Sequence, residues 1–312
     1  MSPGIEGGRL GCVRGVVRGV APGPTLIVVG GLHGNEPAGV EVGAPLLARL
    51  AAAPPAAGEV VVLAGNPEAL AVGRRYLARD LNRQFTPERI AAARTAAAGG
   101  AADVEQRAAL ALADAIAAIV ARARGPVFAV DLHTTSADGV PFSIVIGSPA
   151  TQEFAARFPL PGLVGLEGSC GGTLGQHLGA LGCVALAIEG GQHESAAART
   201  NLEAVVTIAL AASELAPHGD DTRAAEAQLT RAGAAHPRLI EVVLRHAVDE
   251  ARTFRMEPGF ANIQRTPQGT LLAREGDVEI RAPFDGLVLL PLYQPQGTDG
   301  FYYGRELTPR RA

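Results

Sequence analysis

Short apolar runs alternate with alanine-rich stretches over the first two thirds of the chain. Several runs are nearly continuous in valine, isoleucine and leucine, which is typical of strands buried on both faces of a sheet. The runs predict strands at 11–20, 25–32, 59–65, 126–133, 142–147 and 183–191, with helices at 36–52, 103–124, 150–158, 172–181 and 197–215. This alternation predicts an α/β fold with a mixed, mostly parallel sheet flanked by helices.

The pattern changes near His218, where the polar segment APHGDDT interrupts it. Beyond about residue 236, short apolar runs separated by turn residues predict further strands at 239–248, 269–283 and 286–293. We therefore predict two domains, an α/β domain over residues 1–217 and a smaller β-rich domain over residues 218–312.

The basic residues are unusual, because all 27 of them are arginine and the sequence has no lysine. The lack of lysine excludes Schiff-base chemistry, pyridoxal-phosphate attachment, a Walker-type phosphate loop and lysine-linked carrier groups.

A formal net charge of −4 argues against nucleic-acid binding, which needs a concentrated basic surface. The N-terminus does not resemble a signal peptide, and no run of about 18 apolar residues occurs, so we expect a cytoplasmic protein with no membrane partner.

Two strand ends carry histidine. The segment GGLHGNEPAG (30–39) follows a predicted strand and places His33 three positions before Glu36, with the small Gly34 expected to leave room for a cation. His133 ends another predicted strand, in VDLHTTSA. The carboxyl ends of parallel strands meet at one edge of a sheet, and two histidines with one glutamate are a ligand set of catalytic zinc. Each motif is weak alone, but together they predict one Zn²⁺ per chain.

Two further strand ends supply charged groups. Glu189 ends the last buried strand, where it suits a general base, although a helix cap or an ion-pair partner is the alternative. The segment 66–85 is rich in arginine, whose planar fork binds carboxylates, although a solvated basic loop is the alternative. Its polar residues include Arg74, Arg75, Arg79, Asp80, Asn82 and Arg83.

Four ordered motifs, GGLHGNE, NPEAL…RRYLARDLNRQF, DLHTTSA and IEGGQ, resemble the succinylglutamate desuccinylase and aspartoacylase family, which is similar in fold to the zinc carboxypeptidases. The match covers most of residues 25–195. It implies a zinc-dependent amide hydrolase that removes the acyl group from a small N-acyl amino acid. His33, Glu36 and His133 match the zinc ligands of the family, and Glu189 matches its catalytic glutamate.

The resemblance also implies substrate contacts. Arg75 matches the arginine that polarises the scissile carbonyl, and Asn82 with Arg83 matches the pair that holds the α-carboxylate of the substrate. Arg74 and Arg79 have no counterpart, so we expect them at the surface.

The C-terminal segment GTLLAREGDVEIRAPFDGLVLLPL resembles the β-domain that caps the cleft in this family and has the look of a biotinyl carrier. Carrier function needs a lysine, so a lid is expected instead. Of the pair Tyr302–Tyr303, we expect Tyr302 to face the substrate, with an edge-strand tyrosine as the alternative.

The match departs from aspartoacylases at one place. They carry an arginine about ten residues before the catalytic glutamate, where this sequence has Gly179, so N-acetylaspartate is a poor substrate candidate. Other polar residues near the motifs are expected mainly to make structural hydrogen bonds or to support His133. They are Thr134, Thr135, Ser136, His177 and His193.

Two other functions stay open at this point. A carboxypeptidase acting on peptides would use the same residues, and a non-catalytic zinc or ligand-binding protein could keep the fold, although it would need neither Glu189 nor Arg75. An oxidoreductase has no support, because GGLHGNE is not the G-x-G-x-x-G fingerprint. The expected partner is the small substrate, and whether the chain forms homo-oligomers stays open.

Overall fold

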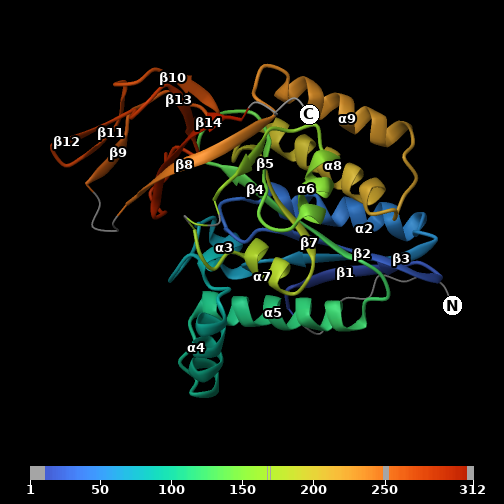
Figure 1. Cartoon of the computed structure of the whole chain (residues 1–312). Helices are drawn as coiled ribbons and strands as arrows, with labels where there is room; N and C mark the ends of the chain where they lie inside the picture. Colours follow the sequence, from blue (N-terminus) through green and yellow to red (C-terminus); the bar gives the residue numbers. More distant parts are fainter. Residues whose placement is uncertain (1–10, 167, 169, 249–252, 308–312) are drawn as a thin grey trace.

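The computed structural model describes residues 11–166, 168, 170–248 and 253–307. These residues form one eleven-stranded sheet with helices on both faces and a separate three-stranded sheet (Figure 1). In spatial order the large sheet contains β1 (Val13–Arg18), β3 (Ala57–Ala64), β2 (Ala21–Gly30), β4 (Val127–Thr135), β7 (Val184–Gln192), β5 (Phe142–Ile144), β6 (Gly162–Val164), β8 (Leu239–Ala247), β14 (Asp299–Glu306), β13 (Gly286–Leu289) and β10 (Gln264–Thr266).

The central strands β3, β2, β4 and β7 are parallel, and antiparallel pairs lie on both sides of them. The predicted fold class is therefore confirmed. The parallel order brings the carboxyl ends of β2, β3, β4 and β7 to one edge, which is where the sequence placed its polar motifs.

Two helical layers cover the sheet (Figure 1). One face packs against α1 (Ala38–Glu41), α2 (Gly43–Ala52), α6 (Pro149–Ala156), α8 (Ala196–Ala212) and α9 (Asp220–Gly233). The other face packs against α5 (Val104–Arg122) and α7 (Leu174–Ala180), together with the short helix η1 (Leu81–Arg83). Two more helices are α3 (Pro67–Val72) and α4 (Pro87–Ala98).

The alternation of side chains along β4 and β7 decides which face receives the polar groups. In β4, Val130 and Leu132 point into the α8 layer, whereas Ala129 points into the α5 layer. Because side chains alternate with a period of two, His133 lies on the α5 side. Glu189 is paired with His133 in register on the neighbouring β7, so both project from the same face at the carboxyl edge.

The helix predicted over 36–52 is broken into α1 and α2. The reason is Pro45, which has no N–H to donate to the carbonyl of Glu41, so a continuous helix would lose a hydrogen bond at that point. Helix α9 was not predicted, because it lies within the segment 218–312 for which the sequence predicts a β-rich domain. Its sequence does carry a signal, because Asp220 and Asp221 occupy the first turn, where acidic groups stabilise a helix.

The C-terminal strands β8, β14, β13 and β10 continue the large sheet, while β9 (Phe254–Met256), β11 (Leu271–Glu275) and β12 (Val278–Arg281) form the small one. The division into domains at residue 217 therefore stays a prediction. Over the described ranges, every helix is too short or too polar to cross a lipid bilayer.

Candidate metal centre and substrate pocket

His33, Glu36 and His133 converge at the carboxyl edge of the sheet. His33 and Glu36 lie in the loop that follows β2, and His133 lies near the end of β4. All three side chains are buried, and one nitrogen or oxygen atom from each lies within 4.8 Å of the others. The sequence prediction that these residues come together is therefore matched by their positions.

Glu36 accepts hydrogen bonds on both of its oxygens. The Nδ1 atoms of His33 and His133 lie 2.8 and 3.0 Å from its carboxylate, and the backbone N–H of Thr134 donates at 3.1 Å. Arg75 adds a donor at 3.3 Å. Burial alone would raise the pKa of Glu36, but the two histidines outweigh burial and hold this pKa well below its ordinary value.

A second carboxylate stands behind each histidine. The Nε2 atom of His33 lies 3.1 Å from Asp80, and that of His133 lies 3.0 Å from Asp131, although the second pair falls outside hydrogen-bond geometry. Metal-binding histidines commonly direct the other ring nitrogen at such a carboxylate, which fixes the orientation of the ring. Both Nδ1 atoms are thereby aimed at the space beside Glu36.

Gly34 is required by the packing around it, and its expected role of leaving room for a cation stays a prediction. A Cβ atom there would lie only 2.2 Å from the backbone carbon of Ala69 and 2.4 Å from the carbonyl oxygen of Arg74. The N–H of Gly34 donates to the carbonyl of Arg75 at 3.1 Å. Glycine is therefore required for the close packing of two loops, which brings Arg75 to Glu36.

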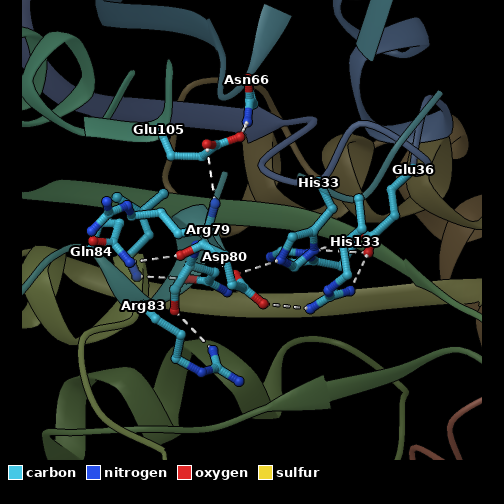
Figure 2. A network of polar contacts seen from close by, with 12 residues as sticks. His33, Glu36, Asn66, Arg79, Asp80, Arg83, Gln84, Glu105 and His133 are labelled. Atoms are coloured by element: carbon cyan, nitrogen blue, oxygen red, sulfur yellow. Dashed lines mark hydrogen bonds and ion pairs between the residues drawn. The ribbon is translucent and has the colours of Figure 1, made fainter. Parts of the chain in front are cut away.

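The loop that carries Arg75 and Asp80 is fixed by a buried carboxylate (Figure 2). Glu105, at the start of α5, is fully buried and accepts hydrogen bonds from the backbone N–H groups of three successive residues, 77–79, at 2.7, 2.9 and 3.3 Å. The side chain of Asn66 donates to the same group at 3.0 Å. Arg75 in turn donates to Asp80 at 3.1 Å, so its guanidinium bridges Glu36 and Asp80.

Arg83 and Asn82 follow on the turn η1. Arg83 donates to Asp299 of β14 at 2.5 Å, and Arg245 of β8 donates to the same carboxylate at 2.6 Å. The side-chain oxygen of Asn82 accepts the N–H of Leu174 at 2.8 Å, which orients its amide toward the pocket.

Glu189 has very different surroundings. It is buried at the end of β7, and its Oε2 atom has no hydrogen-bond partner among the residues that the structure describes. Burial is the main cause that raises its pKa to about 8, with nearby Glu36 and Asp131 adding to the effect against His133 and Arg75. An unpaired buried carboxyl group is costly, so its presence in a pocket indicates a functional role.

One pocket collects these groups. Its lining includes His33, Glu36, Arg75, Asn82, Arg83, His133, Glu189 and Tyr302. The donor set fits zinc, because two imidazole nitrogens and one carboxylate lie within reach of one another, and all three residues line this pocket.

A sequence profile of the Succinylglutamate desuccinylase/Aspartoacylase catalytic domain matches residues 22–212. The chain belongs to the succinylglutamate desuccinylase and aspartoacylase family. Members of this family are deacylases that act on small acylated amino acids. The resemblance drawn from the four motifs is thus confirmed.

Several known proteins resemble the chain over most of its length. The succinylglutamate desuccinylase of Burkholderia thailandensis is 30% identical over 267 residues, which cover 81% of this chain and 71% of that protein. The structure of the succinylglutamate desuccinylase from Chromobacterium violaceum matches with a TM-score of 0.66 at 18% identity, over 95% of this chain and 89% of that one. The ectoine utilization protein EutE (DoeB) of Ruegeria pomeroyi, solved with product bound, matches with a TM-score of 0.65 at 21% identity, over 93% and 88%. The two structures show the shared fold.

The remaining predicted residues divide into those at the pocket and those away from it. Tyr302 lines the pocket, whereas Tyr303 points to the other side of β14 and donates to the carbonyls of Thr266 and Phe284. Tyr302 is buried on an interior strand, not an edge strand, and burial raises the pKa of its phenol far above the ordinary value.

Several other predicted groups make structural contacts. His193 lies 2.7 Å from the hydroxyl of Thr134 and 3.1 Å from Gln294. His177 packs on Phe85 outside the pocket lining. Thr135 donates to the carbonyl of Ala137, and Ser136 lies at the pocket beside Pro291.

The surface predictions for arginine agree with the structure. Arg74 is exposed, and Arg79 pairs with Asp103 at 2.5 Å. Gly179 is exposed in the last turn of α7 and does not line the pocket. Gly175, one turn earlier, does line it.

The sequence alone indicates no role for the four carboxylates that contact the predicted site residues or their loop. They are Asp80, Glu105, Asp131 and Asp299. Asp80 and Asp131 lie inside the quoted motifs and could have been suspected from their spacing to Asn82 and His133. Glu105 and Asp299 had no such signal, because their partners lie far away along the chain.

Proposed function

We propose that the chain is a zinc-dependent deacylase that hydrolyses the amide bond of a small N-acyl amino acid. The observation that carries the proposal is the convergence of the buried triad, an unpaired glutamate and two arginines on one pocket. His33 and His133, through Nδ1, and the carboxylate of Glu36 would hold the zinc. When bound, zinc lowers the pKa of a water molecule to about 7 and polarises the substrate carbonyl.

Glu189 is the proton carrier of the proposed reaction. Its carboxylate accepts a proton from the attacking water as the oxygen of that water bonds to the carbonyl carbon. The same proton then passes to the amide nitrogen as the C–N bond breaks, which yields a carboxylic acid and a free amine. The unpaired Oε2 atom leaves this group free to do so, since no competing hydrogen bond from another described residue holds it.

Arg75 is the proposed oxyanion donor. Two of its nitrogens donate to Glu36 and Asp80, and its buried Nε atom has no partner in the described part of the chain. In this proposal the fixed cation faces the carbonyl oxygen on which negative charge develops, and such preorganised donors lower the barrier.

Asn82 and Arg83 are the proposed contacts of the α-carboxylate, and Tyr302 is proposed as a hydroxyl donor to the substrate. The raised pKa of Tyr302 keeps its O–H protonated at any working pH. Residues from Leu290 to Tyr302 contribute to the pocket wall, which supports a capping role for the β-rich part beyond residue 217.

The test is hydrolysis of a panel of N-acyl amino acids by the purified protein, before and after chelation, with the metal content measured in parallel. We expect about one zinc per chain and release of a free amino acid that stops on chelation and returns when zinc is added. Hydrolysis that survives complete removal of metal would overturn the proposed zinc dependence. Cleavage of peptides in preference to every N-acyl amino acid would favour a carboxypeptidase.

A further inference from the structure

One side of the substrate pocket is apolar. Ala185, Ala187 and Glu189 alternate along β7 and therefore share a face, and the antiparallel strand β5 places Ile144 opposite Ala187. Ile146 continues this face two residues later. Leu166, Leu290 and Leu292 complete an apolar wall beside the polar groups.

Apart from the proposed zinc, the positive charges of the pocket belong to arginines that already face carboxylates of the protein. The arginines among its lining residues are Arg75 and Arg83. Arg75 already faces two carboxylates, Glu36 and Asp80.

The second arginine shares its counter-ion. Arg83 and Arg245 both donate to Asp299, so this group of three carries a net charge of one. The pocket can therefore neutralise one substrate carboxylate at Arg83, and a second one would be buried against isoleucine and leucine without a counter-ion, which is costly.

We propose that the substrate is an N-acyl amino acid with a single carboxylate, whose remaining large group, the side chain or the acyl chain, is apolar and packs on the wall of Ile144, Ile146, Leu166, Leu290 and Leu292. This inference rests on the proposed deacylase function and narrows its substrate class. It separates the chain from enzymes whose substrate carries two or more carboxylates.

The experiment compares substrates of equal shape and different charge, using the zinc-loaded full chain. N-acetyl-leucine is compared with N-acetylaspartate, and N-(4-methylpentanoyl)glycine with N-succinylglycine, because each pair replaces a branched apolar end by a carboxylate. We expect kcat/KM to favour the apolar member by at least about 10-fold in one pair or both, and the dicarboxylate in neither. A dicarboxylate preferred in either pair overturns the inference while leaving the deacylase function intact.

Binding of the same four compounds to the Glu189→Gln protein, followed by calorimetry, gives a second readout that does not need turnover. If no compound is hydrolysed, the proposed function fails, and the binding order still decides the substrate class. Tighter binding of the dicarboxylates would overturn the proposal of a substrate with a single carboxylate.

A charge placed in the pocket should shift the preference. Gly175 lines the pocket, and a Cβ atom there would meet nothing within 4 Å. We expect Gly175→Arg to improve the kcat/KM ratio of N-acetylaspartate to N-acetyl-leucine by about 10-fold, and the matched neutral variant Gly175→Gln to leave this ratio unchanged. An equal shift in both variants would contradict the charge argument.

Discussion

Glu36 and Glu189 line the same pocket, and both are buried, yet they differ in the hydrogen-bond donors that surround them. Around Glu36, two histidines, a backbone N–H and an arginine all approach the carboxylate. Around Glu189, one oxygen has no partner within the described ranges. The pKa of Glu36 is well below its ordinary value, whereas that of Glu189 is raised to about 8.

The difference shows how one pocket can assign two roles to the same side chain. A carboxylate surrounded by donors stays ionised and suits the binding of a cation, whereas one buried without donors exchanges a proton readily near neutral pH. The main cause of the difference in pKa is the number of hydrogen-bond donors, since burial is similar at the two sites. Changes that alter these donors should therefore break or sharpen the contrast.

The largest effect is expected for Glu189→Gln. The amide keeps the shape of the side chain but neither accepts nor returns the proton, so kcat should fall by about 10²- to 10⁴-fold with little change in KM. Steady-state kinetics check this result. Glu194→Gln, an exposed change five residues further on, is the matched control and should retain wild-type turnover. Wild-type turnover in Glu189→Gln would remove this residue from the mechanism.

A smaller effect is expected for Glu105→Gln, which leaves the pocket lining untouched. One of the two oxygens that hold the N–H groups of residues 77–79 is replaced by a donor, so the loop between Arg75 and Asp80 should loosen. We expect the free energy of unfolding to fall by about 1–3 kcal/mol and kcat to fall by about 10-fold. Denaturant unfolding and kinetics measure the two quantities. A loss of stability with unchanged kcat would show that this loop does not position Arg75.

The last effect concerns stability and pH in the metal-free protein and leaves turnover of the zinc-loaded enzyme aside. The folded state keeps a proton on Glu189 that the unfolded chain loses above its ordinary pKa of 4.5, because burial raises the folded-state pKa to about 8. The stabilisation from this proton is complete below pH 4.5 and is lost as the pH rises to about 8. Relative to Glu189→Gln, the wild type should therefore lose stability as the pH rises through this interval. Urea unfolding at several pH values tests this, and a pH-independent difference would contradict the raised pKa.

The sequence predicted the strand ends well, because buried parallel strands read as long apolar runs and polar residues after them stand out. The prediction therefore places His33, Glu36, His133 and Glu189 at one edge of the sheet. The pairing of Glu105 with residues 77–79 could not be predicted from the sequence, since a glutamate early in an amphipathic helix is usually solvated. The same holds for Asp299, whose partner Arg83 lies more than 200 positions away. The small size of Gly34 is evident from the sequence, but the need for glycine there comes from close contact with the loop of Ala69, which depends on tertiary packing.

The most direct test of the account is the zinc content of Glu36→Gln beside that of Glu189→Gln, measured on purified, folded proteins after equilibration with the same free zinc concentration. We expect Glu189→Gln to keep about one zinc per chain without turnover, and Glu36→Gln to lose both zinc and turnover. If Glu36→Gln bound zinc as the wild type does, or if Glu189→Gln lost it, the roles assigned to the two carboxylates would be contradicted.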